Sequence, residues 1–488
     1  MKFNTLGFLV FFPIVVTLYF IFPHRWRWIL LLAGSYLFYI SWNPKYIIVL
    51  LVVTAVGYVA GLWLARETDP KTRRTILIFS LATILGILFF FRYLNHLNRL
   101  LQAVFSQGSG SDLLPEIHLI LPLGISFFTL QVMSYIIDTY RGVARPENRA
   151  GIFAIFIAFF PHLTAGPIAR ANHLLPQFYE THSADYERIV TGFQRMAWGF
   201  FKKLVIADRL ALLVDPVYSD PSSYTGTVLI LATYAFAFQI YCDFSAYADI
   251  AIGAASVMGF QLQENFHQPY YAQSIVDFWR RWHISLSSWL RDYIFYPLSR
   301  ALHRSGMDSK SIPGLILPPM VTMLASGLWH GTKWTFLVWG ALHGMFMVIS
   351  VLANMWKNRL HPQFTLPPRI TAGLKIFVTF NLVSFAWIFF RADTLADAVY
   401  ILGHLFVNPE TPSTLFKNIP GGRYEWMIAL LALLLMEAAQ WMQERNGGMR
   451  TLIRRQPAWL RWSTYYALVI VIFMFGKFGA NEFIYSRF

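Results

Sequence analysis

The chain has 488 residues, of which 56% are hydrophobic and only 13% are charged, and its net charge is +15. Soluble domains carry about 25% charged residues, so this composition excludes an ordinary water-soluble protein and indicates a multi-pass membrane protein. The basic residues fall mostly in loops between apolar runs, which favours lipid headgroups over nucleic acid as their partners, and the single cysteine, Cys242, excludes an intrachain disulfide.

Apolar runs long enough to cross a bilayer recur along the chain and predict an all-α fold with roughly 11 to 14 crossings. No soluble segment of any size separates them, so we expect residues 1–488 to form one multi-pass membrane domain. The first run lacks a strong basic region and a cleavage site, which favours a retained span over a signal peptide. The predicted spans are 6–22, 27–42, 45–65, 75–93, 118–138, 150–166, 190–213, 224–241, 246–260, 313–329, 334–354, 371–390, 425–442 and 462–478.

Two of these apolar regions contain polar residues that do not belong in lipid. Residues 159–170, FFPHLTAGPIAR, place His162 between prolines and predict a broken helix that is buried in protein or lines a cavity. Residues 238–260 contain Asp243 and Asp249. A carboxylate in hydrocarbon is costly, so each acid is expected either to pair with an arginine or to face a polar site.

Residues 276–298, VDFWRRWHISLSSWLRDYIFYPL, show apolar side chains every three or four positions, the pattern of one helix face. The segment is too charged to span the membrane. It predicts a helix lying in the interface with its tryptophans at headgroup depth. His283 lies at the edge of the apolar face, where it either belongs to this anchoring helix or contributes to a polar site.

His330 interrupts a strongly apolar run, with Gly327 and Gly331 on either side. The glycines allow another backbone or a ligand to approach closely. A buried imidazole is either a hydrogen-bonded structural residue or a general base. Together with His283 it predicts a shared polar cavity. The chain contains no HExxH, CxxC, GxSxG or P-loop pattern, which argues against a zinc hydrolase, a redox dithiol, an α/β-hydrolase and an NTPase.

Several stretches are similar to a known family. They are LPLGISFFTLQVMSYIIDTYRG (121–142), FFPHLTAGPIAR (159–170), YCDFSAYADIAIG (241–253), NFHQPYYAQSIVDFWRRWHISLSSWLRDYIFYPL (265–298), SGLWHGTKWTFLVWGALHG (326–344) and WIFFRA (387–392). In these the chain resembles the membrane-bound O-acyltransferase family, in its bacterial alginate O-acetyltransferase branch. FWRRWHISLS and LWHG together are highly specific. The core motifs lie between about residues 118 and 392, whereas residues 395–488 match no motif.

The resemblance implies a ring of tilted transmembrane helices around a central funnel or tunnel, with interfacial and re-entrant helices, in the bacterial inner membrane. It implies an O-acetyltransferase in which His330 is the catalytic base and His283 is the second characteristic polar residue, near the cytoplasmic mouth. Acetyl-CoA is the expected acyl donor, and neither a bound cofactor nor a metal is expected. The residues expected to line the tunnel or shape its mouth are Trp279, Trp282, Arg280, Arg281, Asp292, Trp329, Asp243, Ser126 and Gln131.

The resemblance also implies partners outside the cytoplasm. The acceptor is expected to be a polysaccharide such as alginate or a cell-wall glycan, reached through a periplasmic or anchored SGNH-like acetyltransferase. Membrane lipids are expected partners and nucleic acid is not. Three alternatives stay open at this point. They are a D-alanyl transferase to teichoic acid of the same family, a proton-coupled transporter, and a scaffold subunit of an export complex.

Overall fold

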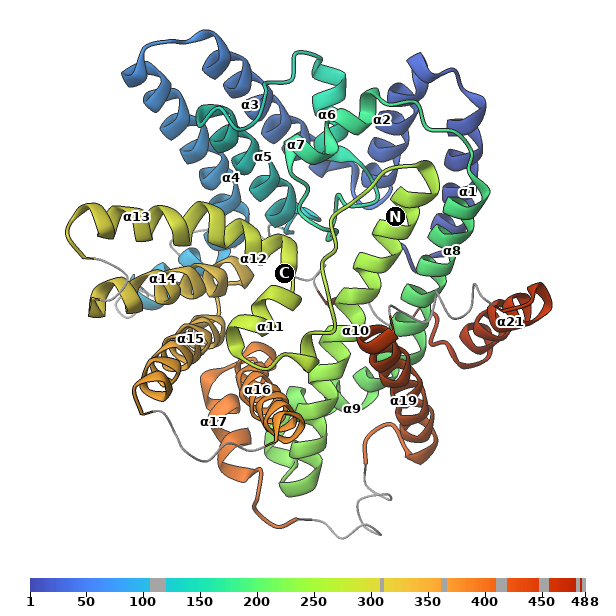
Figure 1. Ribbon diagram of the computed structural model, residues 1–488, viewed down its shortest axis with the longest axis vertical. Helices are drawn as coiled ribbons and strands as arrows, with labels where there is room; N and C mark the ends of the chain where they lie inside the picture. Colours follow the sequence, from blue (N-terminus) through green and yellow to red (C-terminus); the bar gives the residue numbers. More distant parts are fainter. Residues whose placement is uncertain are drawn as a thin grey trace. The chain divides into compact units, whose positions relative to one another are not determined.

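The structure, a computed structural model, describes residues 1–105, 120–307, 311–360, 367–409, 419–446, 456–479 and 483–484. Within these ranges the regular secondary structure is helical throughout (Figure 1). A helix satisfies its backbone hydrogen bonds inside one segment, which is what an apolar run in lipid requires. The expected all-α membrane fold is confirmed, whereas the ring of helices and its central funnel stay predictions.

The described residues fall into two compact units. The first unit contains Met1–Met196 and Ile250–Gln263, and the second contains Ala197–Asp249 and Glu264–Ile484. Two helices, α8 and α10, contribute residues to both. The expectation of one membrane domain over residues 1–488 stays a prediction.

The first unit is built from the N-terminal helices. They are α1 (Leu6–Ile21), α2 (His24–Ile40), η1 (Pro44–Tyr46), α3 (Ile47–Arg66), α4 (Pro70–Phe105), α5 (Ile125–Tyr140), α6 (Ala150–Ala158), α7 (Ala171–Leu174), η2 (Pro176–Tyr179) and most of α8 (Tyr186–Phe200). Residues 159–170 between α6 and α7 are not helical, and His162 within them is buried. The helix break predicted there is confirmed.

The second unit contains the two predicted histidines. Its elements are η3 (Phe201–Ala207), α9 (Asp208–Ser219), η4 (Pro221–Ser223), most of α10 (Gly226–Met258), η5 (Pro269–Tyr271), α11 (Ile275–Arg281), α12 (Ile284–Leu290), η6 (Arg291–Phe295), α13 (Tyr296–Arg304), α14 (Ile312–His330), α15 (Trp334–Leu360), α16 (Pro368–Arg391), α17 (Leu395–His404), α19 (Arg423–Asn446) and α21 (Ala458–Phe475).

Eight helices of the described chain are long and apolar enough to cross a membrane. The number of roughly 11 to 14 crossings stays a prediction, since shorter apolar helices such as Leu6–Ile21 are not among these eight. The predicted spans 224–241 and 246–260 form one continuous helix, α10, and the predicted span 150–166 ends as a helix at Ala158. The eight are Pro44–Arg66, Pro70–Asn95, Gly226–Met258, Ile312–His330, Trp334–Ala353, Pro368–Arg391, Arg423–Glu444 and Ala458–Phe475.

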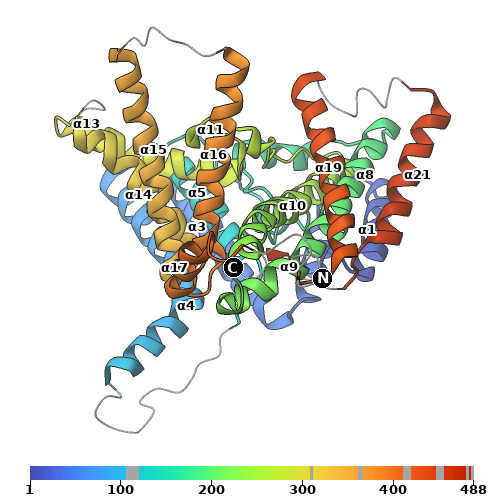
Figure 2. The ribbon, with the colours of Figure 1, turned by 90° about the horizontal axis from the view of Figure 1, so that it is seen from below.

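In the second unit, α14, α15 and α16 lie side by side (Figure 2). Glycines allow α14 and α15 to pack backbone against backbone. A Cβ atom added to Gly327 would overlap the carbonyl oxygen of Phe336, and one added to Gly340 would overlap that of Met323. Such small residues are what close helix crossings in membranes use. The crossing holds the C-terminal end of α14, where His330 lies, against the first turns of α15.

Candidate active site around His330 and His283

His330 is the last residue of α14, and its side chain is buried. Four aromatic rings contributed by α14, α15 and α16 enclose it. Their centroids lie 4.8 Å from that of His330 for Trp329, 5.1 Å for Trp339, 5.1 Å for Phe390 and 6.3 Å for Phe336. An imidazole in such an apolar enclosure can both accept and donate a proton, which its aromatic neighbours cannot do.

The continuous helix predicted over residues 276–298 is wrong. Helix α11 ends at Arg281, helix α12 begins at Ile284, and His283 lies in the break between them. The φ angle of His283 is 44°, in the left-handed region that residues other than glycine seldom adopt. Backbone strain of this kind persists only where the surroundings hold it in place, and it is frequent at functional sites.

Asn265 holds this break in place. Its Oδ1 accepts hydrogen bonds from the Ser285 backbone N–H at 3.1 Å and from the Ser285 hydroxyl at 2.9 Å, and it lies 3.2 Å from Nδ1 of His283. Because an amide oxygen only accepts, Nδ1 of His283 carries the proton and Nε2 offers the lone pair. Burial lowers the pKa of His283 to about 3, so the ring is neutral at physiological pH. His283 therefore presents an acceptor nitrogen, the group that receives a proton or a hydrogen bond.

One tryptophan connects the two histidines. The centroid of Trp329 lies 6.0 Å from that of His283 and 4.8 Å from that of His330. His283 also packs against Phe244, with the two ring centroids 4.7 Å apart and the ring planes perpendicular. The structure thus brings both predicted histidines into one aromatic cluster, although they lie far apart in the sequence. A cavity joining them stays a prediction.

The tryptophans of residues 276–298 are buried among protein side chains, and their depth in the membrane stays a prediction. Trp279, Trp282 and Trp289 are between 1% and 6% exposed. The break at His283 redirects the chain, and the apolar side chains on both sides of it pack into the second unit. Trp282, for example, packs against Trp387 of α16 with a centroid distance of 5.0 Å.

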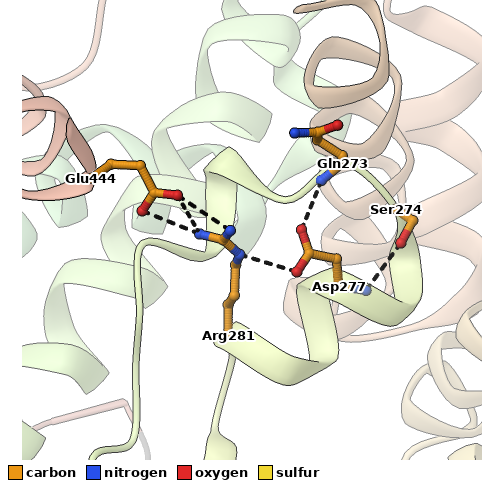
Figure 3. A network of polar contacts seen from close by, with 5 residues as sticks. All are labelled: Gln273, Ser274, Asp277, Arg281 and Glu444. Carbon is orange, nitrogen blue, oxygen red and sulfur yellow. Dashed lines mark hydrogen bonds and ion pairs between the residues drawn. The ribbon is translucent and has the colours of Figure 1, made fainter. Parts of the chain in front are cut away.

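Arg281 ties α11 to α19 (Figure 3). Its guanidinium donates to Asp277 at 3.2 Å and to both carboxylate oxygens of Glu444 at 3.2 to 3.4 Å. Ser274 caps the N-terminus of α11 by accepting from the Asp277 backbone N–H at 3.1 Å. These contacts fix the helix that carries Trp279 and leads into His283.

Two further residues predicted for the mouth lie nearer the surface. Arg280 is exposed, and Asp292 is partly exposed and forms an ion pair with Arg291 at 3.1 Å. Charged side chains at these positions are open to solvent or headgroups. Their assignment to the cytoplasmic mouth stays a prediction.

Asp243 pairs with a lysine, so the expected arginine partner is wrong. Its Oδ1 lies 2.6 Å from Nζ of Lys203, and its Oδ2 accepts from the backbone N–H of Ile484 at 2.7 Å. Asp249 pairs in the same way with Lys202 at 2.7 Å. Ion pairs of this kind offset the cost of placing carboxylates in an apolar helix, which is why α10 continues through both acids. A tunnel-lining role for Asp243 stays a prediction.

Ser126 and Gln131 lie on α5 of the first unit, and both are buried. The Ser126 hydroxyl accepts from Arg92 at 2.5 Å, and the Gln131 amide donates to the carbonyl oxygen of Phe156 at 2.8 Å. Both polar groups therefore have contacts inside their own unit, and their place along a tunnel stays a prediction.

A third buried histidine of the second unit, His343, is not among the residues predicted from the sequence. It lies on α15 one turn after Trp339, is 0% exposed, and accepts a hydrogen bond at Nδ1 from the indole N–H of Trp279 at 3.3 Å. The signal that identifies His330, an imidazole in an apolar run followed by a glycine, is also present here in Gly344. Asn265 carries no comparable signal. Among the described residues, no group of three or more His, Cys, Asp or Glu side chains could hold a metal ion.

Comparisons with known proteins agree with this architecture. The membrane-bound O-acyltransferase family matches residues 150–391, which include His283 and His330. A probable alginate O-acetylase of Pseudomonas aeruginosa is 39% identical over 80% of this chain and 71% of its own length. A peptidoglycan O-acetyltransferase of Helicobacter pylori is 33% identical over 78% of this chain and 73% of its own length. A teichoic acid D-alanyltransferase of Streptococcus thermophilus is 28% identical over 55% and 68%, respectively.

The extent of these matches goes well beyond a shared motif, since the first relative aligns with this chain over 392 residues. The relatives are bacterial, and the eight apolar helices of the described chain are those of a multi-pass membrane protein. The chain therefore belongs to the membrane-bound O-acyltransferase family and is a multi-pass O-acyltransferase of the bacterial inner membrane.

Proposed function

We propose that this enzyme moves acetyl groups from cytoplasmic acetyl-CoA across the inner membrane for the O-acetylation of an extracytoplasmic polysaccharide. The observation that carries the proposal is the burial of His330 and His283 in one aromatic cluster, joined by Trp329. The relatives named for O-acetylation act on alginate and on peptidoglycan, and both of these are glycan polymers.

In the proposed reaction, His330 removes the proton of an acceptor hydroxyl. The hydroxyl oxygen then attacks the carbonyl carbon of the thioester, an ester C–O bond forms, and the C–S bond breaks. CoA leaves as the thiol, with the proton that His330 had taken. His283 orients the donor from the cytoplasmic side. We propose further that the acceptor hydroxyl belongs to a periplasmic or anchored SGNH-like partner, which passes the acetyl group to the sugar.

The other candidate functions have less support. Membership in an acyltransferase family argues against a proton-coupled transporter and against a scaffold subunit of an export complex. Transfer of D-alanine is chemically close, but the D-alanyltransferase relative is 28% identical, compared with 39% for the alginate O-acetylase relative. These comparisons favour acetyl as the acyl group.

The test uses membranes that contain the wild-type chain or the His330→Ala variant. We expect release of CoA thiol from acetyl-CoA, and the yield of acetylated glycan, to fall by about 10²- to 10⁴-fold in the variant, the contribution of a general base. The variant should still be extracted from the membrane as a monodisperse protein. His173→Ala, at an exposed histidine of the first unit, is the control and should keep its activity. Normal transfer by a well-expressed His330→Ala protein would contradict the proposal.

A further inference from the structure

Three ring N–H groups lie buried around His330 and have no hydrogen-bond partner among the described residues. They belong to His343 at Nε2 and to Trp339 and Trp387 at Nε1. All three side chains are at most 1% exposed. Buried polar groups in proteins are nearly always hydrogen-bonded, so three exceptions in one cluster indicate a ligand with matching acceptors.

The tautomer of His343 follows from its one hydrogen bond to another side chain. The indole N–H of Trp279 only donates, so Nδ1 of His343 must be an acceptor. An imidazolium ion has no acceptor nitrogen, and the ring is therefore neutral with its proton on Nε2. His343 is thus a hydrogen-bond donor at Nε2, the reverse of His283, which carries its proton on Nδ1.

Trp339 packs against the proposed base, and His343 and Trp387 both pack against Trp339. Trp339 and His343 are one turn apart on α15, with ring centroids separated by 5.0 Å. Trp339 meets the His330 ring at 5.1 Å, nearly perpendicular to it, and Trp387 of α16 stacks on Trp339 at 5.9 Å. Phe390 packs against both His330 and Trp339. Such a site suits a small uncharged group that accepts hydrogen bonds and otherwise presents carbon.

We infer that the ring N–H groups of Trp339 and His343 hydrogen-bond the carbonyl oxygen of the thioester of the acyl donor, next to His330. The inference rests on the proposed function, since it names the donor groups of that same site. When the acceptor oxygen adds to the carbonyl carbon, negative charge develops on the carbonyl oxygen until the C–S bond breaks and CoA leaves as the thiol. Preorganised donors stabilise that charge more than they stabilise the ground state.

The experiment uses the purified full-length protein in proteoliposomes, with acetyl-CoA as the acyl donor and the SGNH-like partner protein enclosed as the acetyl acceptor. Trp339→Phe removes one N–H and keeps an aromatic ring. His343→Asn keeps an oxygen that can accept from Trp279 but places no N–H at the position of Nε2. His343→Gln restores an amide N–H at that position. Trp63→Phe, at an exposed tryptophan of α3, is the matched control. S-ethyl-CoA, a thioether without a carbonyl group, serves as a competitive inhibitor that measures donor binding in the absence of the carbonyl.

We expect Trp339→Phe and His343→Asn each to lower kcat/KM for acetyl-CoA by about 10²- to 10³-fold, as the loss of one oxyanion donor does. His343→Gln should recover part of that loss, and inhibition by S-ethyl-CoA should stay near the wild-type value in all three. Wild-type kcat/KM in Trp339→Phe and His343→Asn would overturn the inference, and so would an equal loss of S-ethyl-CoA inhibition. A wild-type protein that consumes no acetyl-CoA would overturn the proposed function and the inference with it.

Discussion

His283 and His343 present the same ring nitrogen, Nε2, in opposite protonation states. Asn265 binds Nδ1 of His283 as an acceptor, and Trp279 binds Nδ1 of His343 as a donor. The first histidine therefore offers a lone pair at Nε2 and the second offers an N–H. A transfer reaction needs both kinds of group, one to accept and one to donate a hydrogen bond.

Replacing His283 by asparagine removes the imidazole but keeps the backbone, because asparagine tolerates the left-handed φ of 44° better than alanine does. We expect His283→Asn to fold and to raise the KM for acetyl-CoA more than it lowers kcat, since His283 is assigned to donor binding. Steady-state kinetics on the purified protein measure both constants. A loss confined to kcat would make His283 a chemical partner of His330 and contradict the assignment.

The sequence predicts His330 because an imidazole in an apolar run is costly unless it has a role, and it predicts His283 from its place at the edge of an amphipathic face and from the family resemblance. It cannot predict their tautomers, which depend on Asn265 and other residues brought near by the fold. His343 carries the same signal as His330 and could have been found from it. The lysine partners of Asp243 and Asp249 were not predictable, because Lys203 and Lys202 lie 40 and 47 residues upstream, respectively, in a segment that reads as apolar.

Among the elements, the α14–α15 pair positions His330 most directly. A methyl group at Gly340 would overlap the Met323 carbonyl oxygen on a backbone that cannot move without separating the helices. We expect Gly340→Ala to lower the free energy of unfolding by about 1 to 3 kcal/mol, as overpacking does, and to reduce activity. Thermal unfolding of the detergent-solubilised protein measures the stability effect.

Gly373→Ala on α16 is the matched control, because a Cβ atom there has no neighbour within 4 Å. Alanine is a better helix former than glycine, so this variant should be as stable as the wild type or slightly more stable. Equal unfolding temperatures for Gly340→Ala and Gly373→Ala would mean that the glycine crossing does not position His330.

Hydropathy locates most of the long helices but not their continuity. It divides α10 into two spans because acids interrupt the apolar run, and it joins α11 and α12 into one helix because their apolar periodicity is regular. Both errors have the same cause. Ion pairs to Lys202 and Lys203 keep α10 intact, and hydrogen bonds to Asn265 hold the break at His283, so tertiary contacts override the local pattern.

For the molecule as a whole, the proposed reaction requires the buried histidine cluster to pass an acyl group from one side of the membrane to the other. CoA and a polysaccharide are both too polar to enter hydrocarbon, so each must stay on its own side while the acyl group alone crosses. This requirement gives the enzyme a direction, and the direction can be measured separately from the rate.

The most direct measurement is the sidedness of transfer in inside-out inner-membrane vesicles, whose outer surface is the cytoplasmic face. Acetyl-CoA labelled in its acetyl group is added outside, while the native glycan and any partner protein are enclosed within. We expect CoA thiol outside and labelled acetyl on the enclosed glycan with the wild-type chain, and neither above background with His330→Ala. Label that stays outside the vesicles, or equal transfer by the two proteins, would contradict the proposed reaction.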